Sequence, residues 1–424
     1  MKLKAPPGTE DILPAQAGLW QRLEATAREV FARWGYGEIR TPVLEFTSLF
    51  VRSIGEATDV VEKEMYVIGE GDDSLALRPE ATASVVRAYL QANLHKVRAF
   101  QKFYYIGPMF RHERPQAGRR RQFHQMGIEA IGSLDPLLDA EVVTVACELF
   151  GAFGLSGFHL RLNSIGTPTS RRGYRELIRE RLGRQAEALC PDCRRRLERN
   201  VFRILDCKRP ACVEITRNLP AILDHLPEDE REHFRRVCSA LRSAGVEFEE
   251  DPYLVRGFDY YTATVFEITH GALGAQDALC GGGRYDNLVA DLGGPPLGAV
   301  GFAIGVERVL MALRESGQAE ERPRLDVFVA TVGGDVRPAA FTHLVALRRA
   351  GLRAEADYEG RSLKAQMRSA NKLGARFVLI VGEDEARQGV FRLRNMATAE
   401  EKVLPDIQAV VAEATTDRGS NRCA

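Results

Sequence analysis

The stretch FRHERPQAGRRRQFHQ, residues 110–125, places five arginines and a single acid, Glu113, in sixteen positions. The segments before and after it, FYYIG and MGIEAIG, are aromatic and apolar, and they predict two strands joined as a hairpin. Alternate residues of a strand share one face. On the returning arm, one face therefore carries Phe123, Gln125, Gly127, Glu129 and Ile131.

This face is too polar for a hydrophobic core and suits the floor of a polar binding site. Gly127 leaves room for a ligand, while the amide of Gln125 and the carboxylate of Glu129 would orient it. Arg111, on the outgoing arm, offers a planar fork for phosphate or carboxylate. The tip, RPQAGRRR, is cationic and suits a phosphate backbone. A solvated surface hairpin is the alternative, but strands this apolar favour a central position.

Length and composition indicate a globular protein of two or three domains. The chain has 424 residues, 45% of them apolar, and its 58 basic side chains balance 58 acidic ones. Any affinity for nucleic acid must therefore come from local patches. The N-terminus has no apolar run like that of a signal peptide, and no stretch of about twenty apolar residues could span a bilayer. We therefore expect a cytoplasmic protein with no membrane contact and with reduced thiols.

The order of predicted elements divides the chain. Helical apolar spacing covers 16–34, and further helices are predicted at 82–94 and 137–154, with a strand at 158–166. Strand-like sequence resumes after a region rich in Arg and Glu, and strands alternate with helices beyond the polar linker 315–324. The predicted organisation is an α+β domain built on an antiparallel sheet (1–167 and 241–318), a helical insertion (168–240) and a C-terminal α/β domain (325–424).

Four cysteines within the insertion have a spacing that suggests a metal site. Cys190 and Cys193 form a C-x₂-C pair, and after thirteen residues Cys207 and Cys212 form a C-x₄-C pair. Four thiolates at such spacing can hold a structural zinc ion. The gap of thirteen residues is short of the usual range, so four reduced thiols are the favoured interpretation and zinc is the alternative.

The hairpin resembles the second signature of class II aminoacyl-tRNA synthetases, specifically of histidyl-tRNA synthetases. Five further blocks resemble the same family in the same order: APPGTEDILP (5–14), LALRPEATAS (75–84), VRGFDYYT (255–262), CGGGRYDNL (280–288) and GFAIGVERV (301–309). The family resemblance extends from residue 6 to about residue 410. It implies an ATP-dependent ligase of protein biosynthesis that forms histidyl-adenylate, releases pyrophosphate, and then transfers histidine to the 3′ end of tRNA(His).

The resemblance also assigns roles to individual residues. Arg111 and Arg256 would be catalytic. ATP, accompanied by Mg²⁺, would contact Arg111, Glu113, Arg119 and Arg308. Gln116 would contact the tRNA acceptor end, with Arg120 and Arg121 near phosphates. Histidine would be bound by Glu80, Thr82, Gln125, Glu129, Tyr260, Tyr261 and Tyr285. Glu80 and Thr82 have the parity of residues on one strand face. Two alternatives stay open: the tyrosines could be core aromatics, and Arg308 could lie on a helix surface.

The C-terminal domain would bind the anticodon, which single-stranded loops present for stacking and base-edge contacts. The candidate side chains, spaced by three and four along one predicted helix face, are Arg361, Lys364, Arg368 and Lys372. A solvated helix face is the alternative. The resemblance further implies a homodimer. Two other functions remain: a non-catalytic, histidine-sensing regulatory subunit of ATP phosphoribosyltransferase, and a generic RNA-binding protein. The retained arginines, glutamates and C-terminal domain favour the enzyme.

Overall fold

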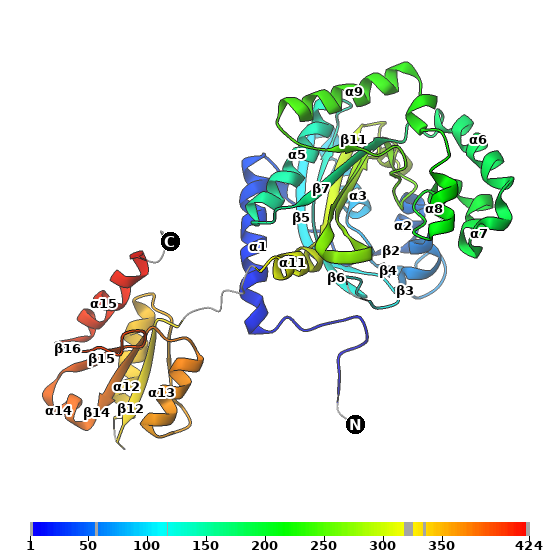
Figure 1. The fold of residues 1–424 in the computed structure, drawn as a ribbon. Coiled ribbons are helices and arrows are strands. Elements are labelled where there is room, and N and C mark those ends of the chain that lie inside the picture. The colour runs from blue at the N-terminus through cyan, green and yellow to red at the C-terminus, as the bar shows by residue number, and fades with distance from the viewer. Residues whose placement is uncertain (1–2, 56–57, 117, 318–324, 334–335, 421–424) are drawn as a thin grey trace. The chain divides into compact units, whose positions relative to one another are not determined.

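The computed structural model describes residues 3–55, 58–116, 118–317, 325–333 and 336–420. The chain forms two compact units, Met1–Ala319 and Glu320–Ala424 (Figure 1). Residues 318–324 of the predicted linker lie outside the described residues. None of the helices in the described ranges combines the length and the apolar character that crossing a bilayer requires.

The first unit is built on a large sheet whose central pairs are antiparallel, as predicted. Within the described residues its strand order is β1-β5-β6-β11-β10-β9-β7-β8, with parallel pairing at the outer pairs β1/β5 and β7/β8. The strands are β1 (Gly37–Glu38), β5 (Gln101–Phe110), β6 (Gln122–Ile131), β7 (Phe158–Ser164), β8 (Glu249–Glu250), β9 (Thr262–His270), β10 (Ala278–Arg284) and β11 (Ala299–Gly305).

The predicted hairpin is confirmed at the centre of this sheet. β5 and β6 pair in continuous antiparallel register from Gln101↔Ile131 to Phe110↔Gln122. Alternation separates the two faces of β6. Met126, Ile128 and Ala130 enter the main hydrophobic core, whereas the intervening polar side chains face away from it. A polar floor is therefore available on the face of the sheet opposite the core.

Helices cover the core face of the sheet. They are α1 (Pro14–Arg33), α5 (Pro136–Ala152), α9 (Glu228–Ser243) and α11 (Val306–Glu315) (Figure 1). In α1 the buried residues Leu19, Leu23, Ala27 and Val30 recur at helical spacing, which is why that segment folds as a helix. Proline at its first position and Gly35, at φ 76°, define its ends.

A second layer of short elements borders the polar face. It consists of α2 (Thr47–Ile54), the π-helix η1 (Val60–Glu64), α3 (Thr82–Gln91), α4 (Leu94–Val97), α10 (Leu288–Asp291), and a small sheet in the order β2-β4-β3. The strands of this sheet are β2 (Leu44–Phe46), β3 (Tyr66–Ile68) and β4 (Leu75–Leu77). Because β4 is the central strand of this sheet, its pairing with β2 and β3 brings the segment before α3 to the rim of the polar floor.

The region predicted as a helical insertion contains short helices. These are α6 (Arg171–Gly183), η2 (Ala186–Ala188), α7 (Pro191–Arg199), η3 (Val201–Ile204), α8 (Pro210–Thr216) and η4 (Ile222–His225). They are followed by α9, which packs on α5 through Phe234, Val237 and Leu241 and belongs to the main core. The part of the region that stands apart from this core therefore ends before α9.

The second unit is the predicted α/β domain. Its sheet has the order β13-β12-β14-β15-β16 within the described residues, parallel at β13/β12/β14 and antiparallel beyond. The strands are β12 (Val327–Val332), β13 (Ala354–Ala356), β14 (Phe377–Gly382), β15 (Phe391–Asn395) and β16 (Glu401–Leu404). The helices are α12 (Arg337–Arg349), α13 (Leu363–Lys372), α14 (Glu383–Gln388) and α15 (Ile407–Ser420).

Candidate active site

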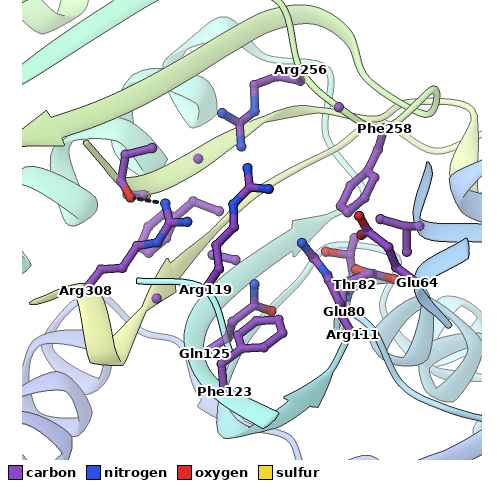
Figure 2. A pocket seen from close by; sticks show the side chains of 18 of the residues that line it. Glu64, Glu80, Thr82, Arg111, Arg119, Phe123, Gln125, Arg256, Phe258 and Arg308 are labelled. Carbon is purple, nitrogen blue, oxygen red and sulfur yellow. Dashed lines mark hydrogen bonds between the residues drawn. The ribbon is translucent and has the colours of Figure 1, made fainter. Parts of the chain in front are cut away.

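A cavity of about 430 Å³ lies over the polar face of the large sheet (Figure 2). Its volume is that of a small-molecule site. Residues from the hairpin, β10, β11, α11 and the loop before β9 converge on it. Twelve of the predicted site residues line the cavity: Glu80, Thr82, Arg111, Glu113, Arg119, Gln125, Glu129, Arg256, Tyr260, Tyr261, Tyr285 and Arg308.

Arg111 is held by a hydrogen bond and by contacts with two aromatic rings. Its Nε donates to the carbonyl oxygen of Pro79 at 2.9 Å. Its guanidinium carbon lies 5.2 Å from the ring centre of Phe123 and 5.6 Å from that of Phe258. These contacts fix the plane of the cation, and its Nη1 forms a long ion pair with Glu113 at 4.0 Å. Glu113, beside it, forms an ion pair with Arg119 at 3.2 Å.

Arg256 reaches the cavity from the loop before β9. Its Nη1 pairs with Glu267 on β9 at 2.8 Å, while its buried Nε has no hydrogen-bond partner. The guanidinium lies directly over Gly281 of β10, where any Cβ would overlap it. Although burial alone would lower its pKa, the neighbouring Tyr261 and Glu267 raise the pKa of Arg256, so the group stays cationic. Gly281, the first glycine of the CGGGRYDNL block, therefore leaves room for this cation at the floor of the cavity.

Arg308 comes from the first turn of α11. Nε donates to the carbonyl oxygen of Gly118 at 3.0 Å, and Nη1 donates to that of Ala278 at 2.6 Å. Burial and the nearby Arg119 lower the pKa of Arg308. Figure 2 shows Arg119, Arg256 and Arg308 approaching one region of the cavity from different elements. Arg119 pairs with Glu113 and Arg256 with Glu267, whereas Arg308 donates to the two carbonyl oxygens, so three guanidinium groups are available to a polyanion here.

Glu129 anchors the other end of the cavity. Thr82 donates through Oγ1 to its Oε1 at 2.7 Å, and the hydroxyl of Tyr285 donates to its Oε2. The carboxyl is fully buried, and this burial raises its pKa to about 8 despite the two hydrogen bonds. A Cβ at Gly301 of β11 would overlap Oε2. The group is thus a fixed polar contact in a dry environment.

The prediction that Glu80 and Thr82 share a strand face is wrong. Glu80 lies in the loop before α3, and Thr82 is the first residue of that helix. The Glu80 carboxylate accepts from the backbone N–H groups of Thr82 at 2.6 Å and Ala83 at 2.9 Å. A carboxylate satisfies the free N–H groups of a helix start, which explains the local fold. Both residues still line the cavity.

The space beside Gly127 is also used differently from the prediction. Gly127 pairs with Tyr105 across the hairpin, and a Cβ there would come within 2.5 Å of the Tyr105 hydroxyl. The glycine makes room for this ring rather than for a ligand. The Tyr105 hydroxyl and Gln125 Oε1 are buried without a hydrogen-bond partner and line the cavity. Buried polar atoms of this kind mark positions where a ligand supplies the missing partner.

Several lining residues were missed by sequence reasoning. Glu64, in the π-helix η1, lines the cavity, and burial together with the nearby Glu113 raises its pKa. Phe258 lies within the quoted VRGFDYYT block, but nothing in its sequence context distinguished it. Tyr105 was read only as part of a strand. Asp59 and Arg203, which form an ion pair at 2.7 Å, bring the insertion to the cavity wall, and no local sequence signal could indicate that contact.

The hairpin tip is partly separate from the cavity. Gln116 does not line it and is exposed; its backbone pairs with that of Arg119. Arg120 lines the cavity and forms an ion pair with Glu10, while the backbone N–H of Arg121 donates to Gly8 at 2.8 Å. The N-terminal segment therefore holds the tip at these two contacts. The four cysteines of the insertion lie together elsewhere, outside the cavity lining.

In the second unit, the four predicted basic residues do not share one helix. Arg361 precedes α13 and pairs with Asp357 at 2.6 Å. Lys364, Arg368 and Lys372 lie on α13 at intervals of four and are exposed. The prediction of one continuous face is therefore wrong for Arg361, because the helix begins two residues after it.

Comparisons with known proteins identify the family of the chain. Residues 8–309 match the family model described as histidyl-tRNA synthetase, and residues 326–415 match an anticodon binding domain. The chain is 50% identical over 414 residues to the histidine--tRNA ligase of Moorella thermoacetica, covering 97% of each chain. It is 48% identical over 413 residues to that of Trichlorobacter lovleyi, covering 97% of this chain and 98% of the relative.

A solved structure supports the same assignment. The apo histidyl-tRNA synthetase of S. aureus superposes with a TM-score of 0.80 at 37% identity, covering 97% of this chain and 99% of that one. Both the fold and the sequence match over almost the full length. The chain belongs to the histidyl-tRNA synthetase family of class II aminoacyl-tRNA synthetases, whose members charge tRNA with histidine.

Proposed function

We propose that this chain ligates histidine to tRNA(His) in two steps, and that both steps use the cavity over the large sheet. The observation that carries the proposal is the division of this cavity into a cationic region and a buried polar end. Arg111, Arg256 and Arg308 come from three separate segments. Glu129, Thr82 and Tyr285 form one hydrogen-bonded group at the other end. A triphosphate and an imidazole amino acid match these two environments.

The first step requires charge neutralisation more than proton transfer. The carboxylate of histidine attacks the α-phosphorus of ATP, an O–P bond forms, and pyrophosphate leaves with the electrons of the broken P–O bond. The carboxylate is already anionic at neutral pH, so no base is needed to activate it. Arg111 and Arg256, held by Pro79 and Glu267, would stabilise negative charge on the α-phosphate, and Arg308 with Arg119 would hold the outer phosphates.

ATP would enter with Mg²⁺ as part of the substrate. Hard cations prefer oxygen ligands, and the Glu64 and Glu113 carboxylates both line the cationic part of the cavity. Burial, and next the negative charge of Glu113, raise the pKa of Glu64. A bound divalent cation would relieve that repulsion and add charge neutralisation at the phosphates.

The amino-acid end supports a specificity for histidine. An imidazole has two nitrogens that both need polar partners in a buried site. Glu129 and Tyr261 are candidates for these two contacts. Glu80, Thr82 and Gln125 would surround the α-ammonium. Tyr260 and Tyr285 would close the pocket. A side chain that lacks the two nitrogens would leave these buried groups without partners, which discriminates strongly against it.

We also propose the remaining partners. In the second step, the 3′ hydroxyl of tRNA(His) attacks the carbonyl carbon of histidyl-adenylate, an ester bond forms, and AMP leaves with the electrons of the broken C–O bond while the hydroxyl proton is released. Gln116 and the tip arginines would meet the acceptor end, and the second unit would bind the anticodon. We assign 1–167 and 241–318 to the catalytic domain, 168–240 to the insertion, whose last helix, α9, packs on the catalytic core, and 325–424 to the anticodon-binding domain. We expect the enzyme to act in the cytoplasm.

A homodimer is part of this proposal. One face of the small sheet exposes apolar side chains from two strands: Leu44 is 44% exposed, Phe46 55% and Ile68 53%. Such an unpartnered apolar face suits a two-fold interface between identical chains. Sedimentation of the full chain should show a dimer that Phe46→Glu weakens, whereas the mutation Val97→Glu, at an exposed apolar residue outside this sheet, should not.

The decisive experiment is ATP–pyrophosphate exchange with each amino acid in turn. We expect exchange with histidine alone. Arg256→Ala should reduce kcat/KM by about 10²-fold or more, because a preorganised cation on the developing charge is lost. Arg236→Ala, an exposed arginine of α9 outside the cavity, serves as the matched control. Absence of exchange in a folded wild-type protein would contradict the proposal and favour the regulatory-subunit alternative.

A further inference from the structure

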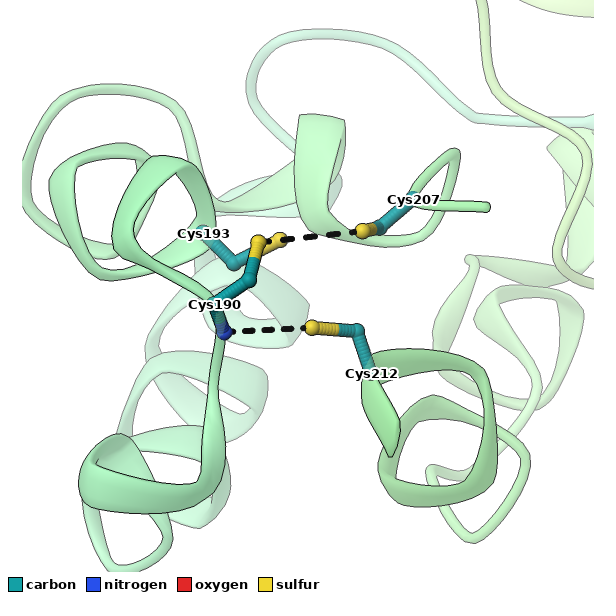
Figure 3. A group of neighbouring side chains, drawn as sticks. All are labelled: Cys190, Cys193, Cys207 and Cys212. Carbon is teal, nitrogen blue, oxygen red and sulfur yellow. Dashed lines mark hydrogen bonds between the residues drawn. The ribbon is translucent and has the colours of Figure 1, made fainter. Parts of the chain in front are cut away.

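The four cysteines of the insertion converge although they come from three separate segments. Cys190 precedes α7 and Cys193 lies in its first turn, Cys207 follows η3, and Cys212 lies in α8 (Figure 3). Their Sγ atoms all lie within 4.8 Å of one another. Cys193 and Cys212 are buried, and the other two are partly exposed. Thiols that merely filled a core would not need to point at a common centre.

We propose that these four cysteines form a tetrathiolate site for one structural zinc ion. Zinc binds sulfur at about 2.3 Å in a tetrahedron, which places the sulfurs about 3.8 Å apart. The spread of the four Sγ atoms is close to that size, and Cys190 and Cys207 are separated by 4.0 Å. This distance is about twice a disulfide bond length, and all four cysteines are free rather than joined in disulfides. This inference does not depend on the proposed reaction.

The surroundings favour an anionic metal centre. The backbone N–H of Cys190 donates to Sγ of Cys212 at 3.3 Å, the kind of bond that orients a ligand thiolate. A zinc ion with four thiolates carries a net charge of −2. Residues 190–212 carry seven Lys or Arg side chains against three acidic ones, which offsets that charge. The helices here are also short, so a metal would contribute stability that they lack alone.

The site has a consequence for the cavity wall. Between the two cysteine pairs, Arg199 pairs with Glu62 at 2.8 Å and Arg203 pairs with Asp59 at 2.7 Å. Glu62 and Asp59 belong to the segment around the π-helix η1, and Asp59 lines the cavity. Zinc would therefore hold the arginine-bearing part of the insertion against the wall of the site. Its role is structural support, since no cysteine of the four lines the cavity.

The first test is the metal content of the full chain, purified without a metal-affinity step and dialysed against metal-free buffer. Elemental analysis should find about one zinc per chain. Modification of the thiols with an organomercurial, followed with a zinc-sensitive dye, should release the same amount, and this measurement needs no variant. Zinc far below one equivalent, or iron in its place, would overturn the assignment.

Matched variants separate metal binding from packing. Cys207→Ser should lose zinc and lower the unfolding midpoint, whereas Cys207→His should retain it, because three cysteines and one histidine also form a structural zinc site. Cys147→Ala, on α5 and outside the group, should keep wild-type zinc content. Circular dichroism should confirm that each variant is folded. Full zinc retention in Cys207→Ser would contradict the proposal, as would loss in Cys147→Ala.

Discussion

At the scale of single residues, the site depends on a carboxyl that is buried although it can ionise. Glu129 keeps its place through the Thr82 and Tyr285 hydroxyls and the absence of a side chain at Gly301. Burial raises its pKa from 4.5 to about 8. Such a group destabilises the empty site but offers a strong, directed contact to a ligand that brings a proton donor.

The raised pKa of Glu129 predicts how stability depends on pH. The unfolded chain releases this proton near pH 4.5, whereas the folded chain retains it up to about pH 8. Between these values the unfolded state binds fewer protons, so the free energy of unfolding falls as pH rises, by about 1.4 kcal/mol per pH unit. Glu129→Gln should remove this contribution. Its unfolding midpoint, relative to wild type, should rise steadily from pH 5 to pH 8.

The control for this pH series is Glu29→Gln, at an exposed carboxyl on α1. Its unfolding midpoint should follow the wild-type curve at every pH. Parallel curves for wild type and Glu129→Gln would show that Glu129 does not hold its proton in the folded state.

Arg111 tests whether a positive charge alone is sufficient. Its guanidinium donates through Nε to Pro79 and lies near the rings of Phe123 and Phe258. Lysine keeps the charge but has neither the planar fork nor that Nε contact. Arg111→Lys should lower kcat for histidine-dependent pyrophosphate exchange by about 10²-fold. Arg236→Lys should leave the rate unchanged, and a wild-type rate in Arg111→Lys would mean that only charge matters.

At the scale of elements, β10 approaches the site so closely that only glycine fits. A Cβ at Gly281 would overlap the Arg256 guanidinium. Gly281→Ala should displace that cation and reduce kcat/KM by about 10²-fold, since small misplacements of catalytic groups cost that much. Gly271→Ala is the control, because no atom lies within 4 Å of its added Cβ. Exchange kinetics and thermal unfolding, measured together, would distinguish the two causes. Displacement of Arg256 should lower kcat/KM alone, whereas misfolding should lower both kcat/KM and the unfolding midpoint.

The elements also show what the sequence can and cannot predict. The β5–β6 hairpin and α1 follow from alternation and helical spacing, which are local properties. The position of Glu80 was wrong because its carboxylate caps α3, a side-chain role that competes with strand periodicity. Glu64 could not be found because a short π-helix has no sequence signature and its neighbours in space are distant in the chain. Site residues were identified mainly through family resemblance, since spacing alone left the tyrosines ambiguous.

At the scale of the whole molecule, the proposed chemistry and the proposed anticodon recognition belong to separate units. Residues that line the cavity all belong to the first unit, and the second has its own hydrophobic core around Val329, Leu344 and Leu379. Substitutions on the surface of the second unit should therefore affect tRNA binding without altering adenylate formation. The exposed row on α13 allows this separation to be measured.

Lys364, Arg368 and Lys372 should contribute to tRNA binding through phosphate contacts. Replacing all three by alanine should raise KM for tRNA and reduce its dependence on salt, because each lost phosphate contact removes about 0.7 from the slope of log affinity against log salt. Pyrophosphate exchange, which needs no tRNA, should stay at the wild-type rate. The control is the double mutant Arg349→Ala/Arg387→Ala, at exposed arginines on other helices of the unit. An unchanged salt slope in the triple variant would show that these α13 side chains do not contact tRNA. A change of slope in both variants would indicate that the whole positive surface of the unit attracts tRNA, rather than one binding face.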